Sequence, residues 1–187
     1  MARSRIRGFA CCNELYEHLP VVEGFRALRA IGYDAVEVAP YTFGHPVFPR
    51  ALADAPAARA AAESIGLAVV GLHWLFARTE RLHVHHPDAA VRLETRDYFL
   101  RCMDLCRALG GEILVMEAPG AIAHVQVNDP NRLGPGMGAL EFEPIRDALA
   151  EAKYAGWLSV EAFDFTPGPE KIARESLAHL RKVWGHG

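Results

Sequence analysis

The stretch Val22-Glu-Gly-Phe-Arg-Ala-Leu-Arg-Ala-Ile-Gly-Tyr-Asp-Ala-Val-Glu-Val-Ala-Pro40 contains a helical pattern, a turn and a strand in succession. Apolar side chains at Phe25, Leu28 and Ile31 recur at helical spacing. Gly32 follows, and glycine ends a helix easily because it adopts the left-handed conformation at little cost. The next run, Ala35–Ala39, is short and apolar, as in a buried strand. The stretch therefore predicts one helix-to-strand unit of an α/β protein.

The same unit recurs along the chain. The predicted strands are Ile6–Ala10, Ala35–Ala39, Ala68–His73, Glu112–Met116, His124–Asn128 and Leu158–Phe163. The predicted helices are Val22–Ile31, Ala53–Ile65, Asp88–Leu109, Pro144–Ala155 and Pro169–Trp184, each followed by a glycine cap at Gly32, Gly66, Gly110, Gly156 or Gly185. Strands that alternate with helices form a parallel sheet with the helices outside it, so the predicted fold class is α/β.

One junction interrupts this alternation. Only residues 117–123 separate the strands Glu112–Met116 and His124–Asn128. Two neighbouring parallel strands need a crossover of a dozen or more residues. The two strands are therefore antiparallel neighbours, are joined by a strained return, or are completed by another subunit.

Length and composition indicate a single globular domain over residues 1–187. The chain is 51% hydrophobic and 23% charged, with a net charge of −3. This composition excludes a disordered chain, and the sequence contains no apolar run long enough to span a membrane. Its arginines are scattered among acids, which argues against a nucleic-acid partner because such a surface needs a basic patch. A complete eight-stranded (β/α) barrel takes about 250 residues, so 187 residues are too few for a standard one.

The cysteines predict buried thiols. Cys102 and Cys106 lie four residues apart on the apolar stripe of a predicted helix, although a metal or redox pair would have the same spacing. Cys11 and Cys12 are adjacent and point to opposite faces of any strand. A chain of this size needs no disulfide, and we expect a reducing, cytoplasmic location.

Polar side chains gather where the predicted strands end. They are Asn13, Glu14, Glu37, His73 with Trp74, Glu117, Gln126, Asn128, Asp129 and Glu161. A carboxylate in an apolar strand is costly unless it is paired or binds a metal, and catalytic groups collect at the carboxyl edge of a parallel sheet. We expect these side chains to converge on a polar site. The alternative is a set of carboxylates that form salt bridges with nearby arginines.

The donor types in this set favour a divalent cation, Mn²⁺, Mg²⁺ or Co²⁺, beside a carboxylate that moves a proton. A second group, His83, His85 and His86, precedes Asp88, which is a candidate helix N-cap. We interpret these histidines as an exposed loop, with a metal site as the alternative. We interpret the glycine-rich segment 134–138 as a mobile loop near the site, because it lacks the lysine of a phosphate-binding loop.

Two blocks of the chain resemble the sugar phosphate isomerase/epimerase family, the xylose isomerase-like TIM barrels. The first block resembles strands one to four of that barrel and contains Cys12-Asn-Glu14, residues 32–40, Val70-Gly-Leu-His-Trp-Leu75 and Asp104-Leu-Cys-Arg-Ala-Leu-Gly-Gly111. The second block resembles strands seven and eight and contains His124-Val-Gln-Val-Asn-Asp-Pro-Asn-Arg132, Pro135-Gly-Met-Gly138 and Gly156-Trp-Leu-Ser-Val-Glu161. The resemblance implies an incomplete (β/α) barrel of about six strands without the segment for strands five and six.

The resemblance also implies a function and roles for individual residues. It implies an isomerase or epimerase that binds a divalent metal and moves a proton through an enediolate of a small sugar or sugar phosphate. By position, Gln126 and Glu161 match metal ligands, and Glu161 also matches the acid/base residue. Arg132 matches the arginine that contacts substrate oxygens, and Glu37 and His73 would line the substrate side. Glu117 and Asp129 are further candidates, since two of the family's metal ligands have no counterpart here.

Two other functions are open at this point. The first is a shortened relative that binds a ligand or acts as a structural oligomer, because two metal ligands are missing. The second, a metal-dependent endonuclease of abasic DNA, shares the barrel but is disfavoured by the negative charge. Open strand edges beside residues 117–124 invite pairing, so we expect a homo-oligomer with no nucleic-acid or membrane partner.

Overall fold

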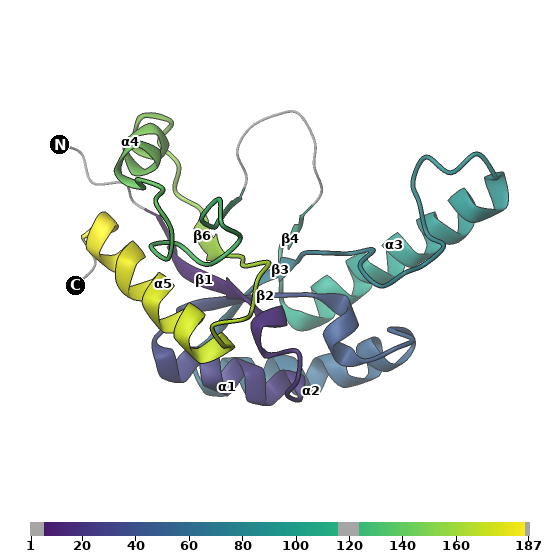
Figure 1. The fold of residues 1–187 in the computed structure, drawn as a ribbon. Helices are drawn as coiled ribbons and strands as arrows, with labels where there is room; N and C mark the ends of the chain where they lie inside the picture. The colour runs from purple at the N-terminus through teal and green to yellow at the C-terminus, as the bar shows by residue number, and fades with distance from the viewer. Residues whose placement is uncertain (1–5, 116–123, 186–187) are drawn as a thin grey trace.

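One sheet of six parallel strands forms the centre of the computed structural model, which describes residues 6–115 and 124–185 (Figure 1). The strand order is β4-β3-β2-β1-β6-β5, and every strand pair is parallel. The strands are β1 Gly8–Cys12, β2 Ala35–Val38, β3 Ala68–Leu72, β4 Ile113–Leu114, β5 Val125–Val127 and β6 Trp157–Val160. The predicted α/β class is therefore confirmed, and the sheet is an open, incomplete barrel.

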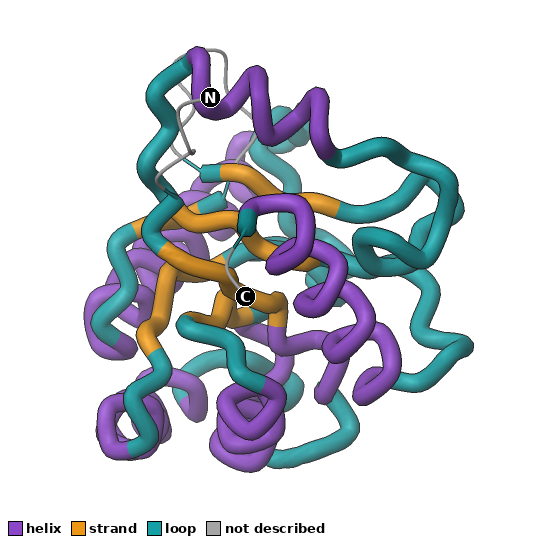
Figure 2. Tube along the Cα trace, turned by 90° about the vertical axis from the view of Figure 1, so that its left-hand side faces the viewer, coloured by secondary structure: helices purple, strands orange, loops and turns teal. Residues whose placement is uncertain are grey.

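The helices cover the outer face of this sheet. They are α1 Val21–Ile31, α2 Arg50–Ser64, α3 Ala89–Leu109, α4 Glu143–Glu151 and α5 Pro169–Trp184, with short 3₁₀ turns η1 Asn13–Tyr16 and η2 Pro40–Phe43. Figure 1 shows α1, α2 and α5 below the strands, and Figure 2 shows the strands in the middle with helices around them. The 3₁₀ turns directly follow β1 and β2, so both lie close to the carboxyl edge of the sheet.

The junction that interrupts the sequence pattern has a topological explanation. The strands on either side of it, β4 and β5, lie at opposite edges of the sheet. The crossover rule applies to neighbouring parallel strands, so it does not constrain this pair. The alternative that they are antiparallel neighbours is wrong for the same reason. Residues 116–123, which include the candidate Glu117, lie outside the described residues.

Most predicted helix ends agree with the structure. Gly32 and Gly110 cap α1 and α3 in the left-handed conformation, and the Asp88 side chain accepts the Ala90 N–H at 2.8 Å as the N-cap of α3. The predicted start of the second helix at Ala53 is wrong, because α2 begins at Arg50; Pro56 lies inside the helix, as in the prediction. A proline removes one helical hydrogen bond, but the surrounding alanines have the highest helix propensity and continue the helix through it.

Further predicted boundaries are wrong, among them the end of the strand predicted over Leu158–Phe163, which is β6 Trp157–Val160. The strand predicted over Ile6–Ala10 is β1 Gly8–Cys12, which pairs Cys12 with Glu37 on β2. The helix predicted up to Ala155 ends at Glu151, and Lys153 adopts the positive φ that Gly156 was expected to provide. The Lys153 N–H donates to Ala150 and the Tyr154 N–H to Leu149, which closes the helix before the glycine.

The interior has two apolar regions separated by the sheet. The larger one fills the space between the strands and the helices, where α2 contributes a stripe of alanines, Ala51, Ala55, Ala58 and Ala62. The smaller one lies on the other face of the sheet and contains Ala10, Ala35, Val70 and Trp157. The strands therefore carry apolar side chains on both faces near their amino ends, as expected of a barrel whose interior is packed.

A close approach between β3 and β4 explains why residue 71 is a glycine. A Cβ atom on Gly71 would lie 1.8 Å from the carbonyl oxygen of Ile113. Only glycine allows the two backbones to pair here, at the edge of the sheet.

The four cysteines are free and buried, as predicted for Cys102 and Cys106. Within residues 6–115 and 124–185, no helix combines the length and the apolar character that a membrane crossing requires.

Candidate active site

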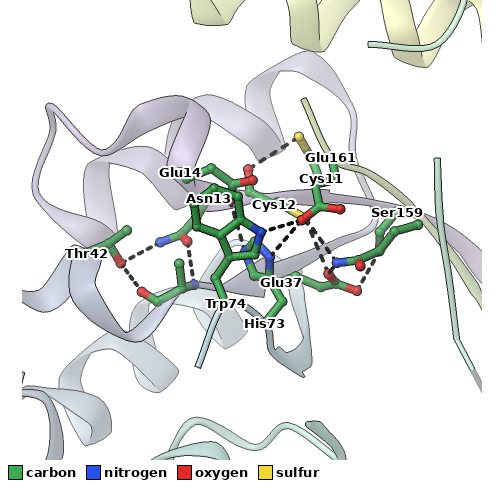
Figure 3. Close-up of polar contacts among 12 residues, drawn as sticks. Cys11, Cys12, Asn13, Glu14, Glu37, Thr42, His73, Trp74, Ser159 and Glu161 are labelled. Carbon is green, nitrogen blue, oxygen red and sulfur yellow. Dashed lines mark hydrogen bonds and ion pairs between the residues drawn. The ribbon is translucent and has the colours of Figure 1, made fainter. Parts of the chain in front are cut away.

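Three ionisable side chains meet at the carboxyl edge of the sheet, and we call them the outer group: Glu14, His73 and Glu161. Glu14 belongs to η1 after β1, His73 follows β3, and Glu161 follows β6. His73 Nε2 lies 3.0 Å from Glu14 Oε2, and His73 Nδ1 lies 3.6 Å from Glu161 Oε1 (Figure 3). Strands β1, β3 and β6 are not consecutive in the sequence, yet their parallel carboxyl ends bring these side chains together.

The carboxylates around His73 favour the protonated form of its imidazole. Burial alone would lower the pKa of His73, but the charge and close contact of Glu14 and the contact with Glu161 raise the pKa to about 10. Burial raises the pKa of Glu14, and the neighbouring His73 reduces that rise. Glu14 and His73 are buried, and Glu161 is the member of the outer group that solvent reaches.

The outer group also has the donors that a divalent cation needs. One ligand atom from each of Glu14, His73 and Glu161 lies within 4.8 Å of the others. Although the ion-pair distance is short, the Glu14 oxygens and both His73 nitrogens have no hydrogen bond of good geometry with the described residues. Two carboxylates and one imidazole suit a hard or borderline ion such as Mn²⁺ or Co²⁺, so these residues fit a metal.

An aromatic pair borders Glu161 on the solvent side. Trp74 Nε1 donates to Glu161 Oε1 at 2.7 Å, and the Trp74 ring stacks on Phe163 with centroids 6.0 Å apart. Both rings are partly exposed, Trp74 at 40% and Phe163 at 37%. Trp74 adopts a positive φ of 51°, which is rare outside glycine and places its ring over the site. Glu161 is therefore reachable from solvent beside an apolar surface.

A second set of polar side chains lies deeper in the barrel, around Glu37, and we call it the Glu37 cluster. Glu37 Oε2 accepts from Gln126 Nε2 at 2.6 Å and from Cys12 Sγ at 3.3 Å. Glu37 Oε1 accepts from Ser159 Oγ at 2.9 Å and also contacts His124 Nε2. Burial would raise the pKa of Glu37, but His124, His73 and Ser159 outweigh it and lower the pKa. The cluster joins β1, β2, β5 and β6 across the concave face.

The structure brings Glu37, His73, Gln126 and Glu161 to the concave face of the sheet, as expected from their positions. The amide nitrogen of Gln126 bonds to Glu37, and its metal-binding role stays a prediction. Arg132 is exposed, and its carbonyl accepts the Phe163 and Asp164 N–H groups. Hydrogen bonds from Thr166 and, to a smaller extent, the charge of Arg132 lower the pKa of Asp164.

Asp129 holds a loop. It is fully buried, and its carboxylate accepts the Gly136 N–H at 2.8 Å and the Leu140 N–H at 2.9 Å. A Cβ on Gly138 would lie 2.5 Å from Asp129 Oδ1, and one on Gly134 would lie 2.0 Å from Ser176 Oγ. These contacts indicate that the glycines serve close packing rather than the mobility expected of the segment.

Three residues that contact the site were not expected from the sequence, namely Cys12, His124 and Ser159. Strand alternation contains a usable signal for two of them, because His124 lies two residues before Gln126 and Ser159 two residues before Glu161. Glu14 and Trp74 lie at strand ends, as their positions in the sequence predict, but the sequence assigned no role to either.

The histidines His83, His85 and His86 lie in the loop before α3, and His83 and His85 are exposed. His83 and His86 use their ring nitrogens to accept the backbone N–H groups of His85 and Asp88 at 3.1 Å. These contacts agree with a capped, solvent-facing loop.

A cavity of about 650 Å³ lies beside the site, between α3 and the loops after β2 and β3. Arg78 lines it and stacks over the Tyr41 ring at 4.3 Å, and Tyr41 lies next to Trp74, with ring centroids 6.4 Å apart. The cavity is thus separated from Glu161 by two aromatic rings, and none of the outer group lines it.

Comparison with known proteins agrees with this architecture. The family described as xylose isomerase-like TIM barrel matches residues 25–122 and 116–183. A protein of Streptomyces coelicolor assigned as a hydroxypyruvate isomerase is 40% identical over 77 residues, which are 38% of this chain and 26% of that relative. The chain therefore matches only about a quarter of that relative's length.

Solved structures of similar fold include two sugar epimerases. A D-psicose 3-epimerase aligns with a TM-score of 0.75 and 14% identity, over 95% of this chain and 99% of the other. A D-allulose 3-epimerase from Methylomonas sp. aligns with a TM-score of 0.68 and 12% identity, over 98% and 99%. At these identities the likeness concerns the fold. The two matched segments of the family meet at residues 116–122, where the strand pattern is interrupted, and we conclude that the chain belongs to the xylose isomerase-like TIM barrel family with an incomplete barrel.

Proposed function

We propose that the protein is an isomerase or epimerase of a small sugar or sugar phosphate that moves a proton by way of an enediolate. The observation that carries the proposal is the placement of Glu161. This carboxylate lies at the carboxyl edge of a family barrel, partly open to solvent, with Trp74 and His73 on the same oxygen. The named relatives, a hydroxypyruvate isomerase and two ketose epimerases, support this reaction class.

In this proposal Glu161 moves the proton. Trp74 and His73 hold Oε1, which leaves Oε2 to accept a proton from the substrate carbon. His73 lies beside the same oxygen, and with a metal bound its neutral imidazole would serve as a ligand rather than as a cation. Arg132, on the exposed loop before Phe163, is the proposed contact to the outer substrate oxygens.

The metal belongs to the same proposal. Glu14, His73 and Glu161 would hold it, and the family resemblance adds Gln126 to this set. A bound Mn²⁺, Mg²⁺ or Co²⁺ would supply Lewis-acid polarisation of the substrate carbonyl. The saturation of Glu37 by protein donors favours a positioning role, since direct contact with substrate requires one of those donors to move.

Exchange of a substrate proton with solvent deuterium tests the reaction on several candidate substrates at once. Hydroxypyruvate, D-psicose and D-fructose are each incubated with the protein and Mn²⁺ in D₂O and followed by NMR. We expect Glu161→Gln to lower the exchange rate by about 10²–10⁴-fold. Glu175→Gln, on the exposed face of α5, is the matched control. An equally active Glu161→Gln protein would overturn the proposal.

The metal is tested by thermal unfolding of the metal-free protein with and without Mn²⁺. A complete site stabilises the fold by mass action, by about 2.7 kcal/mol at one hundred times the dissociation constant. Glu14→Gln should weaken this stabilisation. Calorimetry that detects no divalent cation binding would favour a ligand-binding or structural relative over an enzyme.

We also infer that the chain is one domain that assembles into a homo-oligomer. Strands β4 and β5 have no further strand partner among the residues described, and unpaired edges favour association. A single cooperative unfolding transition together with a dimer or larger species in sedimentation velocity is expected. A cooperative monomer would contradict the assembly.

A further inference from the structure

The Glu37 cluster contains a second set of metal donors, distinct in chemistry from the outer group. One ligand atom from each of Cys12, Glu37 and His73 lies within 4.8 Å of the others. The three residues are fully buried on the neighbouring strands β1 and β2 and at the end of β3. Cys12 is paired in register with Glu37, so its Sγ lies 3.3 Å from Glu37 Oε2. The set combines a thiol, a carboxylate and an imidazole.

These spacings are close to those of a tetrahedral metal site. Zinc binds sulfur at about 2.3 Å and nitrogen or oxygen at about 2.0–2.2 Å, which places the ligand atoms of a tetrahedron about 3.3–3.8 Å apart. The separation between Cys12 and Glu37 is already in that range, and the position of His73 requires a shift of at most about 1 Å. Both His73 ring nitrogens are buried without a hydrogen bond of good geometry among the described residues.

A fourth ligand is available from Gln126. Its amide nitrogen lies 2.6 Å from Glu37 Oε2 and 3.8 Å from Cys12 Sγ. The two ends of an amide are nearly isosteric, and a rotation by 180° places the amide oxygen where the nitrogen lies. His124 and Ser159 would remain on the other carboxylate oxygen and orient it as outer-shell partners.

The three donors suit the charge of a divalent ion. An ion would be held by the Cys12 thiolate, the Glu37 carboxylate and the neutral His73 imidazole, so the protons that Cys12 and His73 carry would leave to solvent on binding. The two negative ligands would then offset the two positive charges of the ion in the interior.

We propose that Cys12, Glu37 and His73, with Gln126 as a fourth ligand, form a buried thiolate site for Zn²⁺ or a similarly thiophilic divalent cation. A thiolate favours such ions over Mg²⁺ and Mn²⁺. Because His73 also belongs to the outer group, one imidazole serves two donor sets. An ion in the thiolate site therefore removes a ligand from the outer group and excludes Mn²⁺ from it. The thiolate site itself does not depend on the proposed isomerase activity.

Cobalt absorption tests the site directly. Co²⁺ is added to the metal-free full-length protein, and a thiolate-to-cobalt charge-transfer band in the near ultraviolet is expected, together with the strong visible bands of tetrahedral cobalt. Cys12→Ser should abolish the charge-transfer band. Cys102→Ser, which removes a buried thiol on α3, is the matched control and should retain it. Binding of Co²⁺ without a charge-transfer band, or a band that survives in Cys12→Ser, would overturn the proposal.

Cys12→Ala is the second variant where Cys12→Ser fails to fold, with circular dichroism as the check on folding; a wild-type protein that binds Co²⁺ without the band already overturns the proposal. Glu14→Gln, which removes an outer-group ligand only, should retain the charge-transfer band, and its loss there would contradict the assigned ligands.

Competition separates this proposal from the proposed function. Because Zn²⁺ binds most donor sets more tightly than Mn²⁺, its effect is measured on the thiolate: one equivalent of Zn²⁺ should remove the charge-transfer band of the Co²⁺-loaded wild type, while Mn²⁺ binding is followed separately by electron paramagnetic resonance. Mn²⁺ binding and proton exchange without any thiolate band would overturn the thiolate site and leave the isomerase proposal standing. A thiolate band in a protein that exchanges no substrate proton would support the thiolate site and overturn the isomerase proposal.

Discussion

The outer group and the Glu37 cluster both place carboxylates on the concave face of the same sheet, but they differ in how those carboxylates are satisfied. Both oxygens of Glu37 accept from side chains of surrounding strands. Glu14 lacks hydrogen bonds of good geometry among the described residues, and Glu161 shares one oxygen between Trp74 and His73. A saturated carboxylate contributes to the fold, whereas an incompletely bonded one is available for chemistry.

The largest expected effect that tests this comparison is on stability. Glu37→Ala removes the acceptor of several buried donors from β1, β5 and β6, and the loss of one partner from a buried charged network costs about 3–5 kcal/mol. Glu161→Ala should cost about 1 kcal/mol, because water can replace it beside the exposed Trp74. Urea denaturation of both variants measures the difference in unfolding free energy. Equal losses of unfolding free energy in the two variants would show that Glu37 and Glu161 do not differ in their contribution to the fold.

A smaller effect concerns the pH dependence of stability in metal-free protein. The pKa of His73 is about 10 in the folded state against an ordinary value of 6.5. Its charge therefore stabilises the fold fully below about pH 6.5, and this contribution of a few kcal/mol declines as the pH rises toward 10. The difference in unfolding free energy between wild type and His73→Gln, measured with a chelator present, should be larger near pH ~6 than near pH ~9.

The control for this measurement is His45→Gln, which removes an exposed imidazole and should not reproduce the difference between pH ~6 and pH ~9. A difference that grows with pH would mean that His73 is neutral in the folded protein, and the outer group would then hold two carboxylates without a cation between them.

The smallest expected effect is on the single hydrogen bond between Trp74 and Glu161. Trp74→Phe retains a ring that can stack on Phe163 but loses the N–H donor at 2.7 Å. A hydrogen bond to a charged group contributes about 1.5 kcal/mol at the low end, which corresponds to about a tenfold fall in kcat. Trp184→Phe is the matched control, because the Trp184 Nε1 has no hydrogen-bond partner in the described part of the chain. An equal fall in both variants would rule out a positioning role for the indole N–H.

Much of the fold could be predicted from the sequence because its signals are local. Apolar runs and periodicity identified the six strands and five α-helices of the described residues, and glycines in the left-handed conformation end α1 and α3 as predicted. The errors lie at element boundaries and in the 3₁₀ turns η1 and η2, which were not predicted. α2 begins at Arg50 rather than at Ala53, and Lys153 closes the turn after α4 before Gly156 is reached.

The candidate site was predictable in position but not in its bonding. Glu37, His73 and Glu161 lie at strand ends, and parallel strands bring such ends together. Which donor meets which oxygen depends on register. The shift between β2 and β3 after Val36, which aligns Glu37 with Gly71, has no signature in either strand alone. Asp129 also follows a strand, as a metal ligand in such a barrel would, yet its carboxylate accepts hydrogen bonds from the N–H groups of a loop.

The central place of β1 in the sheet has a consequence for the order of events during synthesis. Among the six described strands of the sheet, β1 comes earliest in the chain and pairs on one side with β2 and on the other with β6, which comes latest. The His124, Gln126 and Ser159 partners of Glu37 likewise come late in the chain. Such distant contacts delay folding, so a ribosome-bound chain ending near residue 115 has the Glu37 carboxylate without most of its donors and one side of β1 unpaired. Until β6 has been made, that side of β1 presents unpaired backbone groups that can pair with another chain.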